Sequence, residues 1–269
     1  VVQRMRWIPP GLLIMGSPLD EEGRGFDEGP QHEVILSRGY WLGDTPVTQA
    51  LWEAVVGTNP SLFKSSERPV EQVSWDDCMT RFVEGLNKEF LERFPWDERG
   101  NFGLPTEAQW EFACRAGTQM AVYAGEMRIE GGNNAPVLDD IAWYGGNSGV
   151  DFELAVGSDS SDWTYKQYEH TKAGSLPVRQ KHPNAWGLYD MLGNVWEWCL
   201  DGLRRYSSNQ QVDPRGPTDL NGHRVCRGGS WRSSAGRVRG AARFVTDPDY
   251  RYGDLGFRLA RTQELEDQD

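Results

Sequence analysis

The stretch RVCRGGSWRSSAGRVRGAARFVTDPDYRYGDLGFRLAR, from Arg224 to Arg261, decides how the rest of the chain is interpreted. Its two ends, RVCRGGSW and LGFRLAR, are strand-like, whereas the residues between them follow neither the helical nor the strand period. A rigid scaffold often presents a binding or catalytic surface on irregular backbone of this kind. An ordinary surface loop would give the same pattern, so both interpretations stay open at this point.

The composition favours one domain with little regular structure. No linker or low-complexity run divides the 269 residues, so we expect a single domain over residues 1–269. The chain contains 12 Trp, 31 Gly and 15 Pro, which is typical of irregular backbone held together by large apolar side chains. We therefore expect short strands and few helices.

Apolar periods and turn residues predict where these elements lie. The predicted strands cover Met5–Ser17, with a break at Pro9–Gly11, and then His32–Leu36 and Tyr40–Leu42. The predicted helices cover Thr48–Val56, Ser74–Phe90 and Thr106–Gly117, each beginning at a residue that can cap it. The acidic, Ser-rich residues from Asp151 to Trp163 are expected to form an inserted surface loop.

Charge and hydropathy exclude two classes of partner. The formal net charge is −12 and the isoelectric point is about 4.9, so the chain lacks the positive surface that nucleic-acid binding needs. No apolar run approaches the roughly 20 residues that span a bilayer. No signal-peptide pattern follows Val1, so we expect a soluble protein whose cellular location is open.

The metal-binding residue types are scattered. The four cysteines and four histidines form no CxxC, HxxxH or HExxH spacing, which argues against a catalytic transition metal. Cys78 and Cys114 fall on the apolar faces of predicted helices, where buried and unreactive thiols are usual.

Eight motifs occur in a fixed order along Met5–Arg261. They are GLLIMGS, DEGPQHEV, PVTQALW, RPVEQVSWDDC, LPTEAQWEFACRAG, PNAWGLYDMLGNVWEWC, RVCRGGSW and LGFRLAR. In these motifs the chain resembles the formylglycine-generating enzyme family, also called the sulfatase-modifying factor family. The resemblance implies an α+β, C-type-lectin-like fold of the subtype with little regular secondary structure, in agreement with the composition.

Resemblance to this family does not by itself settle the activity, because one scaffold hosts many functions. The oxidase members use two cysteines, with copper, in the segment after GGS-aromatic, where thiolates can hold a soft metal. The matching segment here, Arg232–Arg243, has no cysteine, and Cys226 lies before it. We therefore interpret the chain as a non-oxidase member and expect no copper. A formylglycine-generating-type oxidase, or a related sulfatase-modifying enzyme, is kept as the alternative.

The C-terminal stretch is similar to the variable region of one branch of this family, the variable proteins of diversity-generating retroelements. Their loop is rewritten at asparagine codons of an RNA template. The fixed positions of that loop are matched by Arg227–Trp231, Arg239, Arg243, Pro248, Asp249, Arg251 and Leu255–Arg258. The rewritable positions are matched by Arg232, Ser233, Ser234, Arg237, Phe244, Val245, Thr246, Tyr250, Tyr252, Gly253 and Asp254, which are the predicted ligand-binding residues of a variable region over 224–261.

The residue types in this loop fit such rewriting. Codons of the form NNY cannot encode Lys, Glu, Gln, Met or Trp, and all five types are absent from Arg232 to Asp254. A steric reason for the absence of Glu and Lys is the competing explanation, as is a fixed binding loop in a relative that is not diversified.

A ligand-binding surface is the function that we expect from these residues. Tyrosines and phenylalanine offer contact area at low entropic cost, and Ser, Thr and Asp offer adaptable hydrogen bonds, as in antibody loops. The expected ligand is a protein or another macromolecule. The hypothesis requires Phe244, Tyr250 and Tyr252 to lie on one outer face, with Trp231, Phe257 and the Trp186–Trp198 cluster packed inside.

The motif GNVWEW implies one further site. In formylglycine-generating enzymes it helps to hold a structural calcium ion, and the matching residues are Asn194, Val195 and Glu197. Oxygen ligands of these types suit Ca²⁺. The alternative for Glu197 is a buried carboxylate paired with a cationic side chain.

Overall fold

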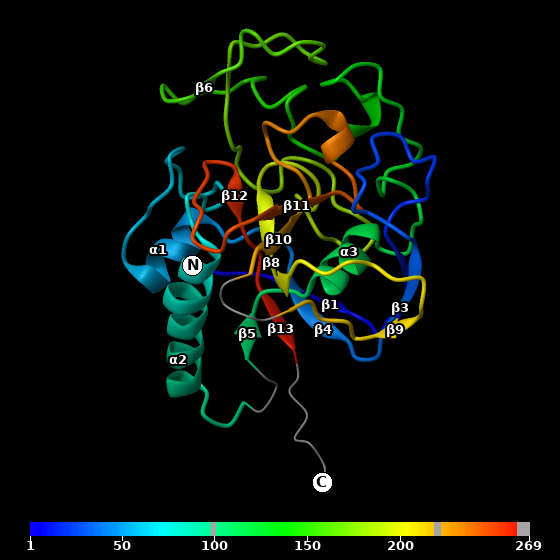
Figure 1. The fold of residues 1–269 in the computed structure, drawn as a ribbon. Coiled ribbons are helices and arrows are strands. Elements are labelled where there is room, and N and C mark those ends of the chain that lie inside the picture. The colour runs from blue at the N-terminus through cyan, green and yellow to red at the C-terminus, as the bar shows by residue number, and fades with distance from the viewer. Residues whose placement is uncertain (98–100, 218–221, 263–269) are drawn as a thin grey trace.

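The computed structural model describes residues 1–97, 101–217 and 222–262. Two four-stranded sheets lie at the centre of this part of the chain (Figure 1). The first contains β1 (Met5–Ile8), β4 (Tyr40–Gly43), β13 (Ala260–Thr262) and β5 (Phe102–Gly103), in that order. All its pairs are antiparallel, and β13 pairs with both β4 and β5.

The second sheet carries the C-terminal stretch. It contains β11 (Arg243–Thr246), β10 (Arg224–Arg227), β8 (Trp196–Gly202) and β12 (Leu255–Gly256), in that order. β12 runs parallel to β8, and the other two pairs are antiparallel. Smaller sheets are formed by β2 (Gly11–Met15), β3 (His32–Leu36) and β9 (Gln211–Val212), and by β6 (Ser158–Asp159) with β7 (Lys172–Ala173).

The first and third predicted helices are confirmed, together with their caps. α1 (Gln49–Val56) begins after Thr48, whose hydroxyl accepts the N–H of Leu51, and ends at Gly57 with a left-handed φ of 83°. α3 (Glu107–Arg115) begins with a capping box between Thr106 and Gln109. These local signals determined both helices because capping depends on residues only three apart.

The second predicted helix has a different form. Ser74 and Asp77 exchange hydrogen bonds as the capping box predicts, but the chain then follows a π-helix, η1 (Asp77–Val83), before α2 (Glu84–Arg93). The buried residues of this helix lie on the π-helical turn, and none lie on α2. Two short 3₁₀ turns, η2 (Pro136–Leu138) and η3 (Ala235–Arg237), complete the helical elements of the described residues.

The apolar core falls into two large clusters. One packs α3 against β2 and β3, with Trp110 fully buried. The other packs α1 and η1 against β8 and β12 around Trp52, Trp198 and Phe257. The expected Trp186–Trp198 cluster is divided between them, because Trp186 packs half-buried on the first cluster. In the described residues, no helix is long and apolar enough to cross a membrane.

Candidate functional site

The predicted variable region is built on β10 and β11. The strand β11 was not predicted, because irregular backbone was expected there. Cys226 lies opposite Phe244, and Val225 opposite Val245, in the antiparallel pair. The strand was missed because its pairing with β10 is not local, and residues 243–246 show no alternation of apolar and polar types. Three predicted ligand-binding positions therefore lie on a strand rather than in a loop.

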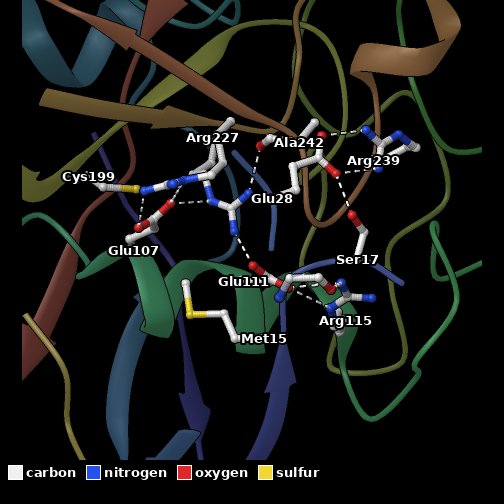
Figure 2. Close-up of polar contacts among 12 residues, drawn as sticks. Met15, Ser17, Glu28, Glu107, Glu111, Arg115, Cys199, Arg227, Arg239 and Ala242 are labelled. Atoms are coloured by element: carbon white, nitrogen blue, oxygen red, sulfur yellow. Dashed lines mark hydrogen bonds and ion pairs between the residues drawn. The ribbon is translucent and has the colours of Figure 1, made fainter. Parts of the chain in front are cut away.

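Four of the five arginines at the fixed positions hold this region to the body through buried ion pairs, whereas Arg251 is exposed and pairs with Asp77. Arg227, Arg239, Arg243 and Arg258 are all at most 2% exposed. Figure 2 shows Arg227 between two carboxylates of α3, Glu107 and Glu111, with its guanidinium also donating to the carbonyl of Ala242. The same Glu111 carboxylate accepts from Arg115, 2.9 Å away, so the charges alternate through the network.

Glu107 joins two of these arginines. Its carboxylate accepts from Nε and Nη2 of Arg243 at 2.7 and 3.1 Å, and it lies 3.4 Å from Nε of Arg227. Burial opposes ionisation of this group, but Arg243 and Arg227 together outweigh that effect and lower the pKa of Glu107. This role was not predicted from the sequence, where its one available signal is a glutamate in the first turn of an amphipathic helix.

Two further pairs hold the middle and the C-terminal end of the region. Arg239 donates to both oxygens of Glu28, at 2.9 and 2.6 Å, and Glu28 also accepts from the hydroxyl of Ser17 (Figure 2). Arg258 donates to both oxygens of Glu197, at 2.6 and 2.7 Å. Arg227, Arg239, Arg243 and Arg258 therefore each bind a buried carboxylate of the body.

The eleven predicted ligand-binding residues differ in exposure. Exposed side chains belong to Arg232, Ser234, Arg237, Tyr250 and Tyr252. Half-buried residues are Phe244, Val245, Gly253 and Asp254, and buried residues are Ser233 and Thr246. Ser233 is turned inward because its hydroxyl accepts the N–H of Ser230, and Thr246 faces Arg224 across the sheet. Ser233 and Thr246 therefore do not belong to the exposed surface.

The structure brings two segments of the region together. The rings of Tyr250 and Tyr252 are 5.6 Å apart, and both are exposed. The indole N–H of Trp231 donates to the carbonyl of Gly253 at 2.9 Å, and the hydroxyl of Ser230 donates to Asp254 at 2.8 Å. These bonds join residues 230–234 to residues 250–254.

Phe244 fits the predicted outer face only in part. The centre of its ring lies 5.5 Å from the ring centre of Trp196, and the side chain packs on the second core cluster. The cause is its place on β11, opposite the fully buried Cys226. Tyr250 and Tyr252 thus supply the exposed aromatic surface, whereas Phe244 packs on the core.

The inserted segment does more than the surface loop that its composition predicts. Trp163 stacks on Trp231 with ring centres 6.0 Å apart, and Phe63 packs edge-on against Trp231. The hydroxyl of Ser148 donates to the carbonyl of Trp231 at 2.6 Å. Trp163 of the insertion therefore covers Trp231, and Ser148, just before the insertion, supports the backbone from which Arg232 projects.

The residues implied for calcium have other partners. Both oxygens of Glu197 bind Arg258, and one also accepts the indole N–H of Trp110 at 2.7 Å. The side-chain oxygen of Asn194 accepts the N–H of Leu176. Among the described residues no group of three or more His, Cys, Asp or Glu side chains is arranged to hold a metal ion. These contacts fit the paired carboxylate and do not fit calcium unless the guanidinium is displaced.

The family resemblance predicts calcium at Asn194, Val195 and Glu197, whereas the ion pair of Glu197 with Arg258 predicts no bound ion. Chelation distinguishes these two predictions. We expect the midpoint of thermal unfolding to be the same in EDTA as in excess Ca²⁺, because Arg258 already neutralises Glu197. A midpoint that rises with added Ca²⁺ and falls again in EDTA would instead show a bound ion.

Comparison with known proteins identifies the family. The profile described as sulfatase-modifying factor enzyme 1-like domain matches residues 1–263. The chain belongs to the sulfatase-modifying factor family. This family member is 32% identical to the chaperone protein LppX of Paenibacillus barcinonensis, over 86% of the chain and 82% of that protein. It is 31% identical to the formylglycine-generating enzyme of Mus musculus, over 85% of the chain but only 53% of the enzyme. It thus spans about half the length of that enzyme.

Solved structures agree with this assignment. Treponema denticola variable protein 1 superposes with a TM-score of 0.72 at 29% identity, covering 96% of this chain and 94% of that protein. PvdO from Pseudomonas aeruginosa superposes with a TM-score of 0.66 at 23% identity, covering 96% and 94%, and shows the shared fold. The family member therefore has the α+β, C-type-lectin-like fold of the formylglycine-generating enzyme subtype.

Proposed function

We propose that this family member is a non-catalytic ligand-binding protein whose C-terminal surface carries exchangeable side chains, as in diversity-generating retroelement variable proteins. The observation that carries the proposal is the division of the region by exposure. Eleven of the fourteen fixed positions are buried, although Asp249 and Arg251 are exposed, whereas only two of the eleven exchangeable positions, Ser233 and Thr246, are buried. Side chains that contact solvent can change while the packing beneath them is kept.

Similarity to a variable protein supports the same proposal. The match to Treponema denticola variable protein 1 extends over 96% of this chain, so it includes the C-terminal region as well as the body. The exposed residues are also of the types that dominate protein-binding surfaces, since Tyr and Arg are enriched at energetic hot spots. A protein or another macromolecule is therefore the proposed ligand, and the net charge of −12 argues against nucleic acid.

An oxidase is the second candidate, because relatives named formylglycine-generating enzyme share 31% identity with this chain. The four cysteines are all free and buried. Burial is the main cause that raises the pKa of the Cys226 thiol well above its usual value, and Asp254 and Cys78 raise it further. A thiol held in its protonated form is a poor ligand for a soft metal and a poor nucleophile. The proposal therefore includes no copper.

Sequencing of this locus across a natural population tests the proposal. We expect substitutions to concentrate at the exposed positions, above all Arg232, Ser234, Arg237, Tyr250 and Tyr252, and to arise from adenine-containing template codons. The fixed arginines should stay constant, because each one binds a buried carboxylate. Substitutions spread evenly along the gene would contradict diversification and leave a fixed binding surface.

A further inference from the structure

A buried carboxylate beneath the variable region lacks a hydrogen-bond partner on one side. The side chain of Glu71 is 0% exposed, and its Oε1 accepts the N–H of Phe63 at 2.9 Å. Its Oε2 is buried and has no donor at hydrogen-bond geometry within the described residues, although the N–H of Leu62 also acts on the carboxylate. Because an unsatisfied buried polar atom costs about 1–3 kcal/mol, this oxygen calls for an explanation.

The open oxygen faces position 253. A β-carbon on residue 253 would lie 3.8 Å from Oε2 of Glu71, with Leu62 and Gln72 at 3.5 and 3.7 Å. All three distances are ordinary van der Waals contacts, so the backbone leaves room for a side chain there. Gly253 supplies none, and the acceptor is left open.

The backbone fixes the direction in which a side chain at position 253 would point. The N–H of Gln72 donates to the carbonyl of Tyr252 at 2.9 Å, and the indole of Trp231 donates to the carbonyl of Gly253 at 2.9 Å. Gln72 has a φ of 62°, which non-glycine residues rarely adopt, and this conformation places its N–H on the variable segment. Residue 253 is thus held on both sides, with its β-position towards Glu71.

We propose that Glu71 is a fixed hydrogen-bond acceptor for the exchangeable residue at position 253, so that this position anchors the segment carrying Tyr250 and Tyr252 instead of contacting the ligand. The inference deepens the proposed function and rests on it, because only an exchangeable position would meet a constant acceptor with changing side chains. Asn and Ser, which NNY codons encode, would bring a donor within reach of Oε2. Apolar residues or glycine would leave the acceptor empty and the segment less firmly held.

The charge of Glu71 makes the missing donor measurable. Burial raises the pKa of Glu71 to about 7, while the N–H groups of Phe63 and Leu62 lower it. The charged groups that act on it are Lys64, which favours ionisation, and Asp254, which opposes it. The pKa of Glu71 in the folded protein lies above its unfolded value of 4.5. The free energy of unfolding therefore falls as pH rises from about 4.5 to about 7, and this loss is complete above that range. A donor at position 253 would stabilise the charged form and reduce this loss.

Thermal unfolding of three full-length proteins tests the inference: the wild type, Gly253→Asn and Gly253→Ala. Alanine is the matched control, since it adds the β-carbon and restricts the unfolded chain but brings no donor. At pH 8 we expect Gly253→Asn to unfold roughly 4 °C or more above Gly253→Ala. When the pH is raised from 5 to 8, the midpoint temperature of unfolding should fall less for Gly253→Asn than for the wild type and Gly253→Ala. Other carboxyls that titrate in this range, such as Asp190 and Asp201, are common to all three proteins.

A double-mutant cycle assigns the effect to Glu71. In the Glu71→Met background the advantage of Asn over Ala at position 253 should disappear, because the acceptor is gone. The inference is overturned if Asn and Ala give equal midpoints and equal pH dependence, or if the Asn advantage persists without Glu71. The pH comparison stands even if Glu71→Met fails to fold. None of these measurements uses a ligand or population sequences, so a negative result here leaves the proposed function intact. Conversely, if population sequencing contradicts diversification, the contact between residue 253 and Glu71 can still be measured.

Discussion

Replacing Glu107 with glutamine is expected to destabilise the protein by about 3–5 kcal/mol. The substitution keeps the shape of the side chain but removes the negative charge that Arg243 and Arg227 share. Arg243 is then left at 2% exposure without its carboxylate, and the amide N–H₂ of the glutamine would face guanidinium donors. Denaturant unfolding followed by tryptophan fluorescence measures the loss.

The control for this experiment is Glu53→Gln, on the exposed side of α1, which should change stability by no more than about 0.5 kcal/mol. The effect should also depend on pH. The pKa of Glu107 is held below its usual value of 4.5, so its contribution is complete above that value and is lost as pH falls through the folded pKa. The difference in the free energy of unfolding between the wild type and Glu107→Gln should therefore become smaller at acidic pH. A loss below 1 kcal/mol at neutral pH would mean that the arginines find other partners.

Replacing Tyr250 and Tyr252 together with alanine is expected to weaken ligand binding by roughly 100-fold or more. The two rings are 48% and 37% exposed and lie against each other, so they form the largest aromatic surface at the predicted positions. The free energy of unfolding should change by less than about 1 kcal/mol, because neither ring belongs to a core cluster.

The wild type and the tyrosine variant are first used side by side for quantitative affinity capture from the same cell extract. The ligand is the species that the wild type retains and the variant does not. Titration of that purified species then gives the affinity ratio. Trp96→Ala is the matched control, because Trp96 is 74% exposed and follows α2, outside the variable region. Equal retention by wild type and the tyrosine variant would move the binding surface elsewhere on the molecule.

Local signals predicted those elements that depend on neighbouring residues. Thr48 with Gly57, and Thr106 with Gln109, mark α1 and α3 because caps are set within one turn. The strand β11 and the π-helical turn at Asp77–Val83 were not predictable in this way. The first depends on pairing with β10, and the second on how the helix packs against its surroundings.

The candidate site shows the same division. Residue types and loop position pointed to Tyr250 and Tyr252, which are exposed, and to Trp231 and Phe257, which are buried. The sequence could not show that Ser233 and Thr246 turn inward, since that follows from contacts with Ser230 and Arg224. Nor could it pair the fixed arginines with Glu107 or Glu28, which lie more than a hundred residues away along the chain.

Under the proposed function, the position of β13 links correct folding to the reading frame of the exchangeable segment. This strand follows Asp254, the last exchangeable position, yet it lies between β4 and β5 in the middle of a sheet. A copy that suffered a frameshift during rewriting would lose β13 and leave two strand edges unpaired. Under the proposed function, we therefore expect a frameshifted product to misfold, so that only copies with an intact reading frame give a folded binding surface.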